Sequence, residues 1–85
     1  MSLNNLRDQA ADFLNKLKAD KFTDADILHE IEQKLSMLKK SNAADQESCN
    51  QIYDIIYLLL ELAAKHNYDL DAEWQKGQAK KQKYL

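Results

Sequence analysis

Apolar residues recur at steps of three and four positions through the first half of this chain, which is the spacing of one face of an α-helix. The first series predicts a helix over residues 3–18, with an apolar face made of Leu3, Leu6, Ala10, Phe13, Leu14 and Leu17. The second predicts a helix over residues 24–40, with one stripe made of Ile27, Leu28, Ile31, Leu35 and Leu38. Thr23 is the expected N-cap of this second helix, because its hydroxyl can accept a hydrogen bond from an exposed backbone amide.

A polar break over residues 41–45 leads into a longer apolar segment, which predicts a third helix that ends near His66. Its apolar arc is wide, and we expect it to bury Cys49, Ile52, Ile55, Ile56, Leu59, Leu60, Leu62 and Ala63. One neighbouring helix covers about half of such an arc. We therefore expect this helix to be central, packed against its own chain and against a second copy.

The end of the chain predicts a fourth, more polar helix. Asn67-Tyr68-Asp69 is a turn, and Asp69 is the expected N-cap of a helix over residues 70–83. Trp74 is the only large apolar anchor in the body of this helix. We therefore expect Trp74 to hold the helix against the rest of the protein.

The composition supports a purely helical fold. The chain has one glycine and no proline, and tight β-turns normally require these residues. Its 85 residues are expected to form a single domain, residues 1–85, with a thin core. The sequence thus predicts an all-α helical bundle of three long helices plus a short C-terminal helix. We expect association into a homodimer, or a dimer of dimers, to complete it.

Charge and apolar run lengths argue against two classes of partner. Lys and Arg total 12 against 14 Asp and Glu, a net charge of −2, which gives no field to attract nucleic acid. The longest apolar block, residues 55–60, is far shorter than the about 20 residues of a membrane-spanning helix. With one cysteine and no apolar signal-peptide core near its start, the sequence predicts a cytoplasmic protein.

Three short segments of the chain, taken in sequence order, match the motifs of a known protein family. Gln51-Ile52-Tyr53-Asp54 opens the long apolar helix, Asn67-Tyr68-Asp69-Leu70 follows it, and the lysine-rich residues 76–84 end the series. Together they resemble the MazG-like all-α nucleoside triphosphate pyrophosphohydrolases, in which an E-x-x-D pair opens the long helix and a basic-Tyr pair ends the last one. The family's E-E-x-x-E motif falls on His29-Glu30-Ile31-Glu32-Gln33. The resemblance covers about residues 13–85.

The resemblance implies a Mg²⁺ site between the second and third helices. The ligands it implies are Glu30 and Asp54, assisted by Gln33 and Gln51. It also implies a nucleotide as substrate, with the phosphates in reach of Lys76, Lys80, Lys81 and Lys83. Of the family's five acidic positions, only two hold acids here, because the other three are His29, Gln33 and Gln51. Mg²⁺ prefers anionic oxygen ligands, so we expect weak metal binding and slow or absent turnover.

These residues also have a purely structural interpretation. Asp26, Glu30 and Gln33 lie at steps that form an ordinary solvated edge of a helix. Asp54 shares a face with Glu61, and this face is either a wet surface or the source of a further acid for the depleted site. Lysines in a last helix meet its negative carbonyl end favourably in any protein.

Two functions therefore stay open. The first is a MazG-like nucleotide pyrophosphohydrolase with weak or lost Mg²⁺-dependent activity. The second is a non-catalytic helical module for dimerisation or for binding a protein partner. Only the first must bind Mg²⁺ and a nucleotide and gain thermal stability from them. In either case we expect Tyr53, Tyr57 and Trp74 to serve as packing or dimer contacts.

Overall fold

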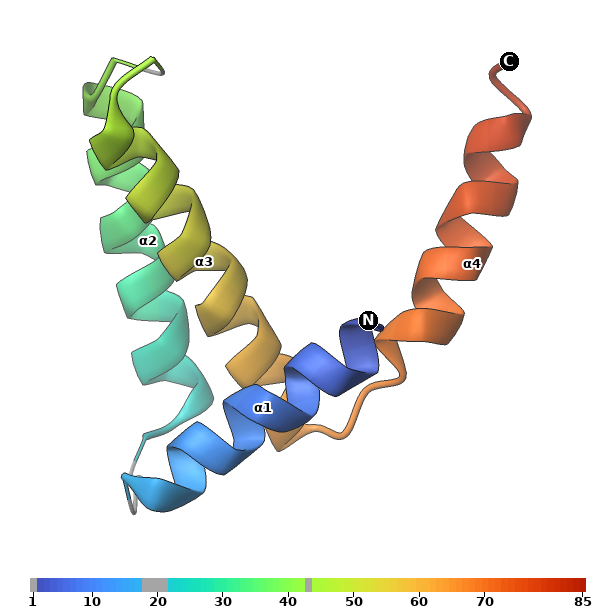
Figure 1. Cartoon of the computed structure of the whole chain (residues 1–85), viewed down its shortest axis with the longest axis horizontal. Helices are drawn as coiled ribbons and strands as arrows, with labels where there is room; N and C mark the ends of the chain where they lie inside the picture. The colour runs from blue at the N-terminus through green and yellow to red at the C-terminus, as the bar shows by residue number, and fades with distance from the viewer. Residues whose placement is uncertain (1, 18–21, 43) are drawn as a thin grey trace.

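The computed structural model describes residues 2–17, 22–42 and 44–85. Within these ranges the chain forms four helices and no strand: α1 (Leu3–Lys16), α2 (Asp24–Lys40), α3 (Gln46–Lys65) and α4 (Leu70–Gln82) (Figure 1). The predicted all-α class and the order of the helices are confirmed. The predicted end of the first helix at residue 18 lies outside the described residues.

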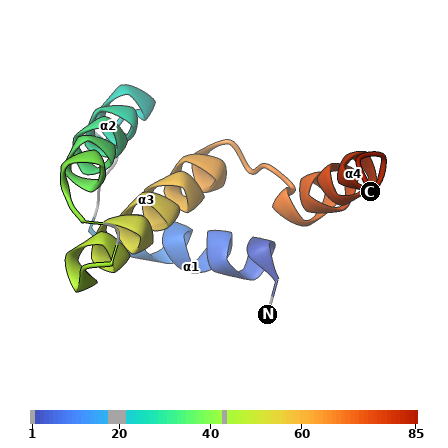
Figure 2. The ribbon, with the colours of Figure 1, turned by 90° about the horizontal axis from the view of Figure 1, so that it is seen from above.

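The four helices form a V rather than a closed bundle. α2 and α3 lie side by side and run antiparallel, and α1 crosses the C-terminal half of α3 (Figure 1). α4 contacts α1 and projects away from α2 and α3 as a separate arm, as the view from above shows (Figure 2). One limb of the V is therefore the α2–α3 pair, the other is α4, and α1 lies at the base.

The predicted N-cap residues of α2 and α4 form hydrogen bonds to the first turn of each helix. The Thr23 hydroxyl accepts from the Asp26 amide at 3.2 Å, and an Asp26 carboxylate oxygen accepts from the Thr23 amide at 3.0 Å. This reciprocal capping box satisfies two backbone donors at the start of α2. At the start of α4, Asp69 Oδ1 accepts from the Ala72 amide at 3.0 Å. Both predicted N-caps are confirmed.

The turn after α3 reverses the direction of the backbone and connects α3 to α4 (Figure 1). Asn67 has φ of 53°, in the left-handed region that asparagine tolerates better than most residues. The Tyr68 amide donates to the Ala63 carbonyl at 3.0 Å, and the Asn67 amide donates to the Ala64 carbonyl at 3.2 Å. These two bonds form a Schellman motif, which ends α3 and satisfies two of its last carbonyls.

The core is small, and α3 is turned differently from the prediction. The buried apolar residues among those described are Ala10, Ile27, Leu58, Leu60 and Ala63. The expected burial of Leu60 and Ala63 is confirmed, whereas Ile55 and Leu62 are only half-buried. Cys49, Ile52, Ile56 and Leu59 are exposed, so one chain alone does not bury them, and their burial against a second copy stays a prediction.

The rotation of α3 has a physical reason. Apolar residues surround most of this helix, so their periodicity does not decide which side meets α1 and α2. The packed side instead includes the polar residues Ser48, Gln51 and Glu61. No helix in the described part of the chain is both long and apolar enough to cross a membrane.

Polar contacts, rather than Trp74, hold α4. Trp74 is 58% exposed, so it does not anchor this helix within one chain, and its expected role as a dimer contact stays a prediction. Asn4 Oδ1 accepts from the Leu70 amide at 2.8 Å, and Asp71 Oδ1 accepts from the Leu3 amide at 2.9 Å. Because α4 lacks an apolar stripe, it docks through its first turn onto the first turn of α1.

Candidate functional site

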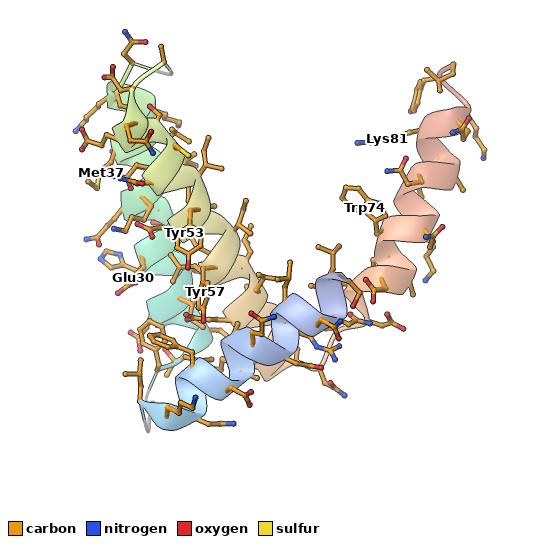
Figure 3. The ribbon with its side chains drawn as sticks, in the orientation of Figure 1. Glu30, Met37, Tyr53, Tyr57, Trp74 and Lys81 are labelled. Atoms are coloured by element: carbon orange, nitrogen blue, oxygen red, sulfur yellow. The ribbon has the colours of Figure 1, made fainter. Side chains whose placement is uncertain are left out.

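An open pocket lies where α1, α2 and α3 meet. Its volume is about 510 Å³, and its lining includes Glu30 from α2 and Asp54 from α3, the two acids that the sequence singled out. Glu61, two turns after Asp54 on α3, lines the same pocket. Figure 3 shows Glu30 beside Tyr53 and Tyr57 on the α2–α3 pair. The structure thus brings the two predicted acids together and adds a third.

Lys34 supplies the positive charge of this pocket. Its Nζ lies 3.3 Å from Asp54 Oδ2, and it lines the pocket with Glu30, four residues earlier on α2. Both side chains of the ion pair are about one-third exposed, at 33% and 39%. Such a pair contributes about 0–1 kcal/mol to stability, so its main effect is on the local charge. Sequence analysis missed Lys34, although its four-residue step from Glu30 places both on one side of the helix.

The two glutamines predicted to assist a metal lie elsewhere. Gln33 is exposed, and its Nε2 lies 3.2 Å from Nε2 of His29. A step of three residues from Glu30 turns Gln33 away by about 60°, whereas a step of four turns Lys34 by only about 40°. Gln51 is buried on α3, and its Oε1 has no hydrogen-bond partner among the described residues. The described lining of the pocket includes neither glutamine, so the ligand roles implied for Gln33 and Gln51 stay predictions.

Glu61 is the most unusual acid of the site. Only 5% of the residue is exposed, so the interpretation of this face of α3 as a wet surface is wrong at this position. Burial, and secondarily the negative charge of Glu30, raises the pKa of the Glu61 carboxyl. Within residues 2–17, 22–42 and 44–85, no group donates a hydrogen bond to it. A smaller cavity of about 280 Å³ also borders Glu61, between Phe13, Leu14 and Leu58.

Aromatic rings line the pocket next to these acids. Phe13 of α1 meets Tyr57 of α3 edge to face, with ring centroids 5.7 Å apart. Tyr53 lies one turn earlier on α3, with its ring centroid 5.9 Å from that of Tyr57. Burial is the main cause of the raised pKa of Tyr57. The packing contacts expected for Tyr53 and Tyr57 are therefore present within one chain.

No protein family, curated protein or solved structure matches this chain. The resemblance to the MazG-like family consequently rests on the motifs alone.

The described side chains do not by themselves enclose a Mg²⁺ ion. Mg²⁺ requires several oxygen ligands at about 2.0–2.1 Å in near-octahedral geometry. In the described part of the chain, no group of three His, Cys, Asp or Glu residues is placed to hold one metal ion. Asp54, moreover, is already paired with the Lys34 ammonium.

The lysines expected to bind substrate phosphates lie on the α4 arm. Lys76, Lys80, Lys81 and Lys83 are exposed, and Lys76 Nζ lies 3.2 Å from Glu73 on the same helix. Figure 3 shows Lys81 on the limb of the V opposite Glu30. Within one chain, these lysines and the acidic pocket are therefore parts of different limbs.

Proposed function

We propose that this chain is a MazG-like helical domain that acts by self-association rather than by catalysis. One observation carries the proposal. On α3, Cys49, Ile52, Ile56 and Leu59 are exposed, at steps of three, four and three residues. These are the steps of the a and d positions in a coiled coil, whose apolar seam faces a partner helix. We call these four residues the α3 seam.

The exposure of the α3 seam is large for a protein of this size. Ile52, Ile56 and Leu59 are 49%, 50% and 48% exposed. Burying an aliphatic side chain completely is worth about 1.5–3 kcal/mol, so covering the exposed half of each is worth roughly 1 kcal/mol. Leu28, Leu35 and Met37, which are apolar side chains on α2, are exposed to a similar degree. A second copy that covers these surfaces explains why they are apolar.

Two features of the acidic pocket support the non-catalytic part of the proposal. Lys34 pairs with Asp54, the only family acid on α3, and so reduces the negative charge that a metal ion would meet there. Gln33, which stands at a family ligand position, faces solvent beside His29. Hydrolysis of a nucleoside triphosphate needs divalent metal to neutralise phosphate charge, and these side chains work against it.

Sedimentation equilibrium over a range of protein concentrations tests self-association. We expect the wild type to dimerise reversibly and Ile56→Glu to remain monomeric, because the substitution places charges in the α3 seam. Asn50→Glu is the matched control, since it adds the same charge at an exposed position of the same helix. A wild type that stays a folded monomer at high micromolar concentration, or equal behaviour of the two variants, contradicts the proposal.

A second candidate function is Mg²⁺-dependent nucleotide pyrophosphohydrolysis. It is favoured by one observation, the convergence of Glu30 and Asp54 on a single pocket. It requires Lys34 to release Asp54. Thermal shift with a panel of nucleotides, with and without Mg²⁺, tests it, because ligands that bind only the native state raise the melting temperature. Stabilisation that depends on Mg²⁺, lost in Asp54→Asn and kept in Glu32→Gln, supports this candidate, and pyrophosphate release establishes turnover.

A further inference from the structure

The pocket where α1, α2 and α3 meet combines acids with aromatic rings. Glu30, Asp54 and Glu61 supply three carboxylates, and Tyr53 and Tyr57 supply ring surface. Its volume of about 510 Å³ lies within the range of small-molecule sites. Concave sites that join apolar walls with a few convergent polar groups are typical of ligand binding.

The charges of this pocket are unbalanced. Lys34 is its only basic lining residue among those described, and it is already paired with Asp54 at 3.3 Å. Glu61 is 95% buried by residue area, since only 5% is exposed, and no described group donates to it. A carboxylate with so little exposed surface around it is stabilised by a cation or hydrogen-bond donor that reaches it from the pocket. Glu30 adds a second negative charge close to Glu61, as its effect on the pKa of Glu61 shows.

The spacing of the acids favours an organic cation over a metal ion. The described acids do not come close enough for three of them to hold one ion, so a ligand that spans them needs separated charges. Tyrosine rings attract ammonium groups through their faces, and their surface also suits a methylene chain. Lys34 shows the matching chemistry within the chain, because it already places an alkylammonium group against Asp54.

We propose that this pocket binds a small alkyl diamine. One ammonium group lies between Glu61 and Glu30, and the methylene chain lies against Tyr53 and Tyr57. The second ammonium group extends toward the pocket mouth, where Asp54 is partly exposed. Diamine binding requires neither self-association of the chain nor a nucleotide. Its test is therefore independent of the tests for self-association and for nucleotide hydrolysis.

Calorimetric titration with 1,4-diaminobutane tests the proposal, with salt sufficient to screen weak surface attraction. We expect saturable binding to the wild type and at least about tenfold weaker binding to Glu61→Gln, which keeps the side-chain shape but removes the charge. Glu32→Gln is the matched control, because it removes one negative charge from an exposed position on α2. Its affinity should stay within about twofold of the wild type.

A second variant and a competing ion complete the test. Glu30→Gln alters an exposed side chain and should also weaken binding, which keeps the test valid if Glu61→Gln folds poorly by circular dichroism. Butylamine, with one charge, should bind more weakly than the diamine. The proposal is overturned if no saturable binding occurs, or if Glu61→Gln and Glu32→Gln bind the diamine equally. It is also overturned if Mg²⁺ displaces the bound diamine at a lower concentration than the diamine requires to saturate the pocket.

Discussion

Truncation of Leu58 and of Ile56 should separate the core of one chain from the α3 seam. Leu58 is 7% exposed and Ile56 is 50% exposed, although the two residues are only two positions apart on α3. Leu58→Ala leaves a cavity, which costs about 2–5 kcal/mol and is large against a total stability of about 5–15 kcal/mol. Ile56→Ala removes a side chain that is half in water, so in an isolated chain it should cost only roughly 1 kcal/mol.

Urea unfolding followed by circular dichroism, at a low and a high protein concentration, distinguishes the two effects. Leu58→Ala should lower the free energy of unfolding by a similar amount at both concentrations. Ile56→Ala should cost little in dilute protein and more in concentrated protein, where a second copy covers the α3 seam. If Ile56→Ala is the more damaging change in dilute protein, the rotation of α3 described above is wrong.

Three further outcomes are expected from the polar contacts. Asn4→Ala removes the acceptor of the Leu70 amide, so amide hydrogen exchange should speed up in α4 and change little in α2. The hydrogen bond from Asn4 is the main cause of the lowered pKa of Asp69. The ionised Asp69 therefore stabilises the fold above the ordinary pKa of aspartate, and this stability is lost as pH falls through the lowered pKa. Asp69→Asn should reduce this acid-side loss in thermal melts. Burial raises the pKa of Glu61, which favours the protonated form in the folded chain, so wild-type stability should fall as pH rises through that raised pKa. Glu61→Gln should lack this fall, and an unchanged pH profile argues against the burial of this carboxyl.

Local signals in the sequence predicted the helices well. The caps at Thr23 and Asp69 act within one turn of the chain, so the residue types suffice to place them. Glu30 and Asp54, which the family resemblance assigned to one site, do line the same pocket between α2 and α3.

Features that depend on packing between helices could not be predicted in the same way. The orientation of α3 is one, since apolar residues on most of its surface make several rotations equally suitable. The docking of α4 is another, because single polar side chains such as Asn4 and Asp71 hold it and leave no periodic pattern. Lys34 could not be predicted from the family pattern, because the pattern has its ligand position at Gln33, one residue earlier.

The attachment of α4 has a mechanical consequence. This helix has 13 residues and therefore extends about 20 Å from its joint with α1. A rotation of about 10° at that joint moves the far end of the helix by about 3 Å, close to the width of a water molecule. A small rotation of the joint at Asn4 therefore produces a larger displacement of Lys80 and Lys81. The positions of the C-terminal lysines depend on contacts at the opposite end of their helix.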